Sequence, residues 1–151
     1  MGKCLETTRA WAAGQPALGA EALKALDGQL YDAARECDAA AIERLAAEGA
    51  SPNARDEDWT PAVYSAAAWG HAGAVSALVR LGADLDATDS AGLTGLMAAA
   101  YNGEVECARA LLAGGADRTL RGTHDGYYKG KTALEIAEAY GEAEVAALLR
   151  E

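Results

Sequence analysis

Small and apolar residues recur along this chain with a period of 33 residues. Paired alanines mark the first half of each period, a leucine marks the second half, and glycine followed by alanine closes it. The matching positions are Ala33-Ala34, Ala66-Ala67 and Ala99-Ala100, then Leu45, Leu78 and Leu111, then Gly49-Ala50, Gly82-Ala83 and Gly115-Ala116. Self-similarity at such a period is typical of an array of stacked supersecondary units.

Within one period the pattern predicts two helices joined by a turn. In the second segment apolar residues follow i, i+3, i+4 spacing, as Val75, Leu78 and Val79 do, while Arg80 falls on the opposite side. Gly82 then ends the helix, because the left-handed cap residue is free of strain only when it is glycine. The paired alanines favour helix and let neighbouring helix pairs pack closely. Each repeat is therefore predicted to be helix, turn, helix and loop.

This unit resembles the ankyrin repeat, whose pattern contains T-P-L-H, paired alanines, G-H and a later G-A-D. The residues that carry the resemblance are Thr94-Gly95-Leu96, Ala99-Ala100, Asn102-Gly103, Gly115-Ala116-Asp117, Gly70-His71 and Gly82-Ala83-Asp84. The resemblance covers about residues 29–151 and implies an all-α, ankyrin-type helix-turn-helix solenoid of about four repeats. We divide them as 29–55, 56–88, 89–121 and 122–151.

Three features depart from the family pattern. The T-P-L-H histidine, which usually ties a hairpin to its helix, is replaced throughout, by Tyr31, Tyr64, Met97 and Glu135 in turn. We therefore expect the hairpins to be anchored differently. Keeping the spacing to Gly70 puts Trp59 where a turn glycine is expected, and Cys37 replaces the inter-helix glycine of the first repeat.

The last repeat contains a five-residue insertion, because Thr94 and Thr132 are 38 residues apart rather than 33. The extra residues fall in the loop 118–131, which carries two tyrosines and an excess of basic residues: Arg118, Arg121, Tyr127, Tyr128, Lys129 and Lys131, against the single acid Asp125. Insertions in repeat arrays map to loops on one face, often the binding face. A solvated, glycine-rich connection explains the loop equally well.

Residues 1–28 precede the first clear repeat, and we interpret them as an N-terminal helical cap. The segment Pro16 to Leu26 predicts a short helix that ends at Asp27-Gly28. Terminal units of an array need such a cap over the exposed end of the core, and we expect Trp11 to pack inward. The alternative is that this cap is a decayed earlier repeat.

Composition narrows the classes of partner. The net charge of -10 argues against nucleic acid, which needs a basic surface, and favours a basic protein partner or simple solubility. No apolar run is long enough to span a membrane. The cysteines Cys4, Cys37 and Cys107 are odd in number and widely spaced, which indicates a reducing, cytoplasmic setting. We expect a monomer.

The sequence carries no recognisable catalytic chemistry. A nucleophilic pair would need Cys37 or Cys107 beside one of the two histidines, His71 and His124. No metal-ligand spacing appears, and the glycines follow the repeat rather than a phosphate-binding loop. We therefore expect no catalytic residues, no metal and no cofactor, and conclude that the chain is not an enzyme.

Aromatic residues just after the paired alanines are the best candidates for binding. The matching slots are Arg35-Glu36, Ala68-Trp69, Tyr101-Asn102 and Ala139-Tyr140, and stacking is expected to place their aromatic members in one ladder. The resemblance implies that the hairpin tips and this edge of the first helix form a concave surface for a protein partner. Aromatic residues and arginine are common interface hot spots, although each alone is more often a packing residue. The predicted partner-binding residues are Trp59, Trp69, Tyr101, Asn102, Arg121, Tyr127, Tyr128, Lys129 and Tyr140.

The chain is thus predicted to be a non-enzymatic protein-protein interaction module that binds through its concave face. The alternative is a regulatory or accessory subunit that inhibits or positions an enzyme through the inserted loop 118–131. Asn53 also resembles the asparagine that intracellular hydroxylases modify in some ankyrin repeats. A loop-capping hydrogen bond is the simpler interpretation of Asn53.

Overall fold

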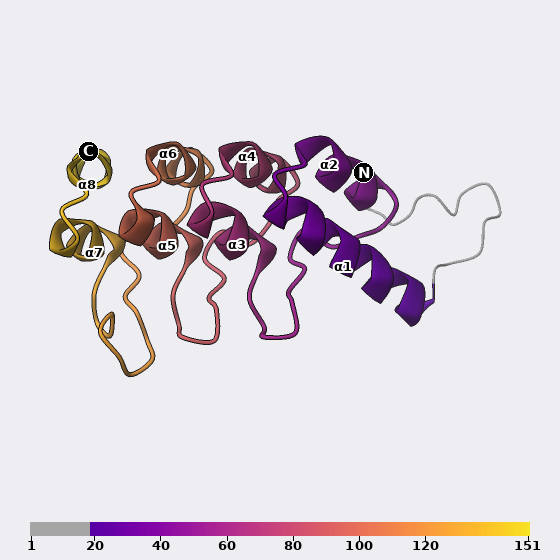
Figure 1. Ribbon diagram of the computed structural model, residues 1–151, viewed down its shortest axis with the longest axis horizontal. Helices are drawn as coiled ribbons and strands as arrows, with labels where there is room; N and C mark the ends of the chain where they lie inside the picture. The colour runs from indigo at the N-terminus through magenta and orange to yellow at the C-terminus, as the bar shows by residue number, and fades with distance from the viewer. Residues whose placement is uncertain (1–18) are drawn as a thin grey trace.

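A computed structural model describes residues 19–151. The helices in this range form four stacked pairs: α1 (Ala20–Arg35) with α2 (Ala39–Ala47), α3 (Ala62–Ala68) with α4 (Ala72–Arg80), α5 (Gly95–Asn102) with α6 (Val105–Ala113), and α7 (Ala133–Ala139) with α8 (Ala143–Arg150). The first helices form one row, the second helices form another, and the connecting loops project beyond the first row (Figure 1). This arrangement confirms the predicted all-α repeat solenoid.

The core lies between the two rows and runs through all four pairs. Its largest side chains are fully buried, among them Leu30, Ile42, Leu78, Leu96, Leu111 and Ile136. The paired alanines are buried as well, and Ala34, Ala67 and Ala100 have no exposed surface. Since alanine extends no further than Cβ, these residues let successive first helices pack directly against one another.

A left-handed residue turns the chain between the two helices of every pair. The backbone φ is 60° at Cys37, 77° at Gly70, 71° at Gly103 and 73° at Gly141. The next residue then donates its N–H to a carbonyl of the first helix, as Asp38 does to Ala33. Cys37 therefore takes the conformation of the glycine that it replaces.

Hairpins connect the first three pairs, and their turns confirm the predicted position of Trp59. Arg55 pairs with Pro61 in the first hairpin and Thr88 pairs with Thr94 in the second. Trp59 has φ 66°, and Gly92, which lies one period later, has φ 75°.

Tyrosine takes over the role of the missing histidine in the first repeat. The hydroxyl of Tyr31 donates to Asp56 Oδ2 at 3.0 Å, which ties α1 to the hairpin 55–61. In the last repeat Glu135 instead forms a capping box with Thr132 at the start of α7. The anchoring differs from the family pattern, as predicted, and it differs between repeats.

The predicted helix end at Asp27-Gly28 is wrong, because α1 continues without a break to Arg35. Asp27 does not act as a terminator here: its Oδ1 accepts a hydrogen bond from the backbone N–H of Ser51 at 2.7 Å. The helix is also held beyond Gly28 by Leu30, which is completely buried. Pro16 and Trp11 lie outside the described residues.

Among residues 19–151, no helix combines the length and the apolar character needed to cross a bilayer.

Candidate partner-binding surface

Four tyrosines from separate parts of the chain form one cluster on the loop side of the first helices. Tyr101 comes from α5, Tyr140 follows α7, and Tyr127 and Tyr128 belong to the insertion. The ring centroids of Tyr101 and Tyr140 are 4.6 Å apart at an interplanar angle of 78°, and those of Tyr101 and Tyr128 are 5.7 Å apart at 83°. Edge-to-face contacts of this kind are favourable for aromatic rings. We call these four residues the tyrosine cluster.

The cluster is fixed at one end and exposed at the other. The hydroxyls of Tyr128 and Tyr140 are hydrogen-bonded at 2.9 Å, and the ring of Tyr128 is half-buried. Burial, followed by this hydrogen bond, raises the pKa of the Tyr128 phenol, which therefore stays neutral at physiological pH. Tyr127 is 63% exposed and Tyr101 and Tyr140 are each 42% exposed. Three rings are thus available on a packed support.

The cations of the insertion hold the loop itself. Arg121 donates to the carbonyl of Gly130 at 2.6 Å and to Glu135 at 2.9 Å. Lys129 pairs with Asp125. Arg121 and Lys129, both predicted to contact a partner, are therefore already engaged within the chain.

The other two cations of the loop are also in contact with neighbouring groups. Arg118 donates to the carbonyls of Leu149 and Glu151, at the C-terminal end of α8, and the ammonium of Lys131 lies 5.3 Å from the ring centroid of Tyr127. The positive charge of the loop thus supports its own structure.

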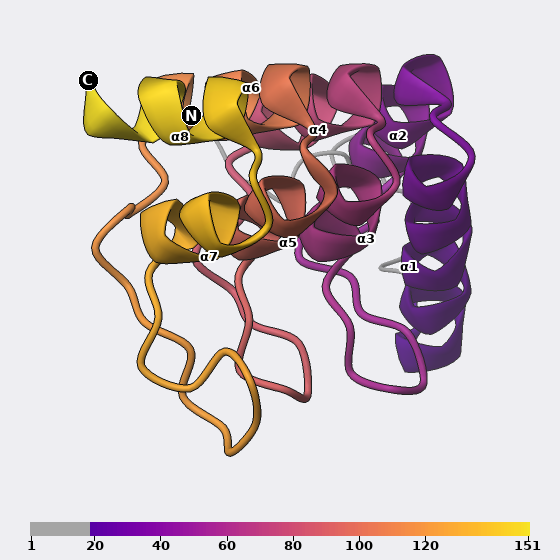
Figure 2. The ribbon, with the colours of Figure 1, turned by 60° about the vertical axis from the view of Figure 1, so that its left-hand side comes forward.

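The insertion forms a closed loop. The N–H of Gly122 donates to the carbonyl of Lys131 at 3.0 Å, and the N–H of Gly130 donates to the carbonyl of Gly122 at 2.8 Å. Thr123 and His124 lie so close to Gly92 that a Cβ there would overlap them. The loop is thereby held against the tip of the preceding hairpin. It also projects further from the helices than the two hairpins do (Figure 2).

The expected aromatic ladder is interrupted at Trp69. This residue follows α3 and is 69% exposed, but within residues 19–151 no aromatic contact joins it to Tyr101. The amide of Asn102 donates to the carbonyls of Ala68 at 3.1 Å and Ala98 at 3.2 Å. Asn102 thus ties α5 to α3, while Tyr101 and Tyr140 join the insertion in the tyrosine cluster.

A groove lies at the other end of the same side of the molecule, between α1 and the hairpin 55–61. It has a volume of about 930 Å³, and Trp59, which is 67% exposed, lies at its edge. Its charged lining residues are Lys24, Asp27, Asp32, Arg35, Arg55, Asp56, Glu57 and Asp58. A second hollow of about 530 Å³ shares Tyr31, Arg35 and Asp56 with it and reaches Trp69. We call the first of these the N-terminal groove.

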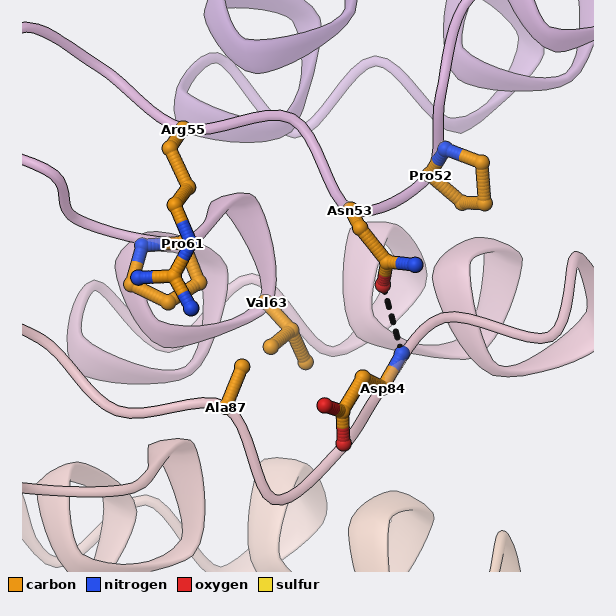
Figure 3. A pocket seen from close by; sticks show the side chains of 7 residues that line it. All are labelled: Pro52, Asn53, Arg55, Pro61, Val63, Asp84 and Ala87. Atoms are coloured by element: carbon orange, nitrogen blue, oxygen red, sulfur yellow. Dashed lines mark hydrogen bonds between the residues drawn. The ribbon is translucent and has the colours of Figure 1, made fainter.

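Asn53 makes the hydrogen bond that its position in the loop indicated. Its Oδ1 accepts from the backbone N–H of Asp84 at 2.6 Å, beside a cavity of about 150 Å³ next to Pro61 and Val63 (Figure 3). Asp86, one period later, accepts from Asp117 N–H at 2.8 Å in the same way. Asn53 therefore links successive repeats, and its hydroxylation stays a prediction.

Among residues 19–151, no hydrogen bond joins a cysteine to a histidine. Burial, with a smaller effect of Glu104, raises the pKa of the Cys107 thiol to about 11, which disfavours the nucleophilic thiolate. Cys37 is exposed, but His71 lines the smaller hollow without a cysteine, and His124 bonds to Thr123. In the range 19–151 no group of histidine, cysteine and carboxylate side chains is arranged to hold a metal ion.

The geometry defines a class of protein: a helical repeat solenoid whose loop side carries exposed aromatic side chains. A family model described as ankyrin repeats (3 copies) matches residues 30–122 and 66–151. The chain belongs to the ankyrin repeat family. Members of this family are generally non-enzymatic modules for protein-protein interaction. No curated protein matches the chain in sequence.

Proposed function

We propose that this chain is a non-enzymatic module that holds a protein partner on the surface formed by its hairpins and first helices. The tyrosine cluster carries the proposal. Tyrosine rings supply a large contact area at low conformational cost, and their hydroxyls add hydrogen bonds, so they are frequent interface hot spots. Three of the four rings are exposed over 42–63% of their surface. Contiguous exposed patches of this kind mark interaction sites more often than isolated exposed residues do.

The test is affinity capture from the lysate of the native cell, with the wild type beside a variant carrying Tyr101→Ala, Tyr127→Ala and Tyr140→Ala. Tyr128 is left in place because it is half-buried and supports the loop. A matched control is Arg109→Ala on α6, an exposed residue in the row of second helices. Circular dichroism checks that every variant remains helical. We expect the partner to be retained by the control and lost by the triple variant. If the folded triple variant captures the same proteins as the wild type, the cluster is only structural.

A second function is supported by the projecting insertion. A regulatory or accessory subunit would use this loop to occlude or position an enzyme, and Tyr127 within the loop is exposed. If the captured partner is an enzyme, binding and inhibition by a Tyr127 variant distinguish the two functions. Replacement of Tyr127 by alanine should leave binding in place and abolish inhibition if the loop is the inhibitory element. If binding and inhibition persist together, the alternative fails.

We also propose a monomer that works in the cytoplasm without nucleic acid. The net charge of -10 disfavours contact with phosphates. Cys37 and Cys107 are free thiols, which agrees with a reducing compartment. Gel filtration would give the oligomeric state, and elution at the size of a dimer would contradict the monomer.

A further inference from the structure

We propose that the N-terminal groove binds an extended, arginine-containing segment of the protein partner. This inference rests on the proposed function, because it assigns a chemical class of ligand to one half of the same binding surface. The proposal depends on the shape of the groove, the charge of its walls and the conformation of Trp59.

The shape follows from the length of α1. The other first helices have seven or eight residues, but α1 has 16, and its additional residues precede the stretch that aligns with α3. They run alongside the hairpin 55–61 (Figure 2). From Lys24 to Arg35 the helix rises by about 16 Å, which is the length of about five residues of extended chain. The groove therefore has room for a short strand-like segment.

The walls of the groove are acidic. Five carboxylates line it, from Asp27, Asp32, Asp56, Glu57 and Asp58, against the three cations Lys24, Arg35 and Arg55. Burial alone would raise the pKa of Asp56, but hydrogen bonds from Thr60, Tyr31 and Asp58 lower it, so this carboxylate is ionised at neutral pH.

Two groups of carboxylates can be distinguished in the groove. Asp27 and Asp56 are used by the fold, because they accept hydrogen bonds from Ser51 and from the hairpin. Within residues 19–151, the carboxylates of Asp32, Glu57 and Asp58 take part in no ion pair and accept no hydrogen bond. They lie on both walls and are exposed, in a position to receive cationic groups of a ligand.

Trp59 makes an aromatic platform at the edge of the same groove. A left-handed backbone is unfavourable for a residue with a side chain, and the next hairpin has glycine at this position. The guanidinium of Arg55 lies over the indole at 5.0 Å and is fixed by hydrogen bonds to the carbonyls of Trp59 at 2.7 Å and Thr88 at 2.8 Å. The indole nevertheless remains 67% exposed. Residues with a strained backbone cluster at functional sites, ligand clamps among them.

Arginine is the side chain that fits both features. Its planar guanidinium forms bidentate pairs with carboxylates and stacks on aromatic rings, whereas lysine offers a strongly hydrated point charge. A nucleic acid or an acidic peptide would be repelled by the five carboxylates. The ligand is therefore a cationic peptide in an extended conformation.

Fluorescence anisotropy with defined peptides tests the proposal. The probe is a nine-residue peptide of alternating arginine and serine with a fluorescein label, and the same peptide with glutamate in place of arginine is the control ligand. We expect the arginine peptide alone to bind, more weakly at about 0.3 M salt than at about 0.05 M. The double variant Glu57→Gln/Asp58→Asn should weaken binding about five- to twentyfold, because the loss of each exposed ion pair typically weakens binding a few-fold. Trp59→Gly should weaken it about threefold or more while keeping the left-handed turn.

A matched variant separates the groove from the overall charge of the protein. Glu106→Gln/Glu144→Gln removes the same two charges from α6 and α8, and we expect it to bind the arginine peptide within about twofold of the wild type. Equal losses for the two double variants would overturn the proposal, and so would binding of the glutamate peptide or no binding of the arginine peptide.

Capture from lysate distinguishes this inference from the proposed function. A partner lost by the tyrosine triple variant and retained by Trp59→Gly and Glu57→Gln/Asp58→Asn would leave the binding module in place and overturn the groove. A partner lost by all of these folded variants would support both.

Discussion

The turn at Cys37 allows a stability prediction whose sign and size follow from the backbone. Cys37 has φ 60°, and its three equivalents are glycines with φ between 71° and 77°. Holding a residue with a Cβ in this conformation costs about 1–2 kcal/mol. Glycine removes this cost, but it also gives the unfolded chain more conformational freedom, which reduces the gain in stability by about 0.4–1 kcal/mol. Because Cys37 is exposed, its side chain contributes little burial. Cys37→Gly should therefore stabilise the protein by about 0.5–1 kcal/mol.

Gly141 provides the reverse experiment in the same protein. It has φ 73°, and a Cβ added there would have no other atom within 4 Å. Gly141→Ala therefore introduces the backbone cost without a steric clash, and it should destabilise the protein by about 0.5–1 kcal/mol. Cys37→Ala serves as the control, because it removes the thiol and keeps the Cβ.

Thermal unfolding followed by circular dichroism measures all three variants. For a chain of 151 residues, a change of 1 kcal/mol shifts the Tm by about 2–4 °C. We expect the Tm to rise by about 2 °C in Cys37→Gly, to fall by a similar amount in Gly141→Ala and to stay unchanged in Cys37→Ala. If Cys37→Ala raises the Tm as much as Cys37→Gly does, the thiol rather than the backbone is responsible and the reasoning is refuted.

Three further predictions concern hydrogen bonds. The lowered pKa of Asp56 stabilises the fold above pH about 3.9, the unfolded value, and this contribution is lost as the pH falls through the folded value. In Asp56→Asn the denaturant midpoint should therefore depend less on pH between about 5 and 3 than it does in the wild type. An unchanged pH dependence would contradict this. Asn53→Ala loses the bond to Asp84 N–H and should cost about 1 kcal/mol in urea unfolding; the reasoning fails if stability is unaffected. Tyr140→Phe removes a hydrogen bond that raises the pKa of Tyr128. Ultraviolet titration should show a lower pKa for Tyr128 in this variant, although burial keeps it above the ordinary value. A higher pKa would contradict the prediction.

The repeating parts of the fold could be predicted because their causes are local. A left-handed turn and an alanine face depend on residues within one period, so the same signals recur and Trp59 and Cys37 could be assigned to glycine positions. The end of α1 could not be predicted in this way. Asp27 followed by Gly28 is a helix-ending pair by local rules, but Asp27 bonds to Ser51, 24 residues away. The N-terminal groove depends on this long helix and was missed for the same reason.

The candidate site was only partly predictable. Tyr101 and Tyr140 follow from the repeat, since stacking brings the matching slots Tyr101-Asn102 and Ala139-Tyr140 side by side. Their contacts with Tyr127 and Tyr128 depend on the path of an insertion that has no counterpart in the other repeats. That path is fixed by the hydrogen bonds between Gly122, Gly130 and Lys131, which no hydrophobic pattern encodes.

The distribution of charged residues along the sequence did not indicate which of them are available to a partner. The basic residues of the insertion stand out in a chain with a net charge of -10, but Arg118, Arg121 and Lys129 bond to groups of the chain itself. Forming contacts with a partner would require these residues to break their existing hydrogen bonds or ion pairs. The dispersed acids look like an ordinary solvated surface in the sequence, but α1 and the first hairpin bring five of them around one groove. We therefore assign recognition by charge to the N-terminal groove and recognition by aromatic contact to the tyrosine cluster, as parts of the proposed binding surface.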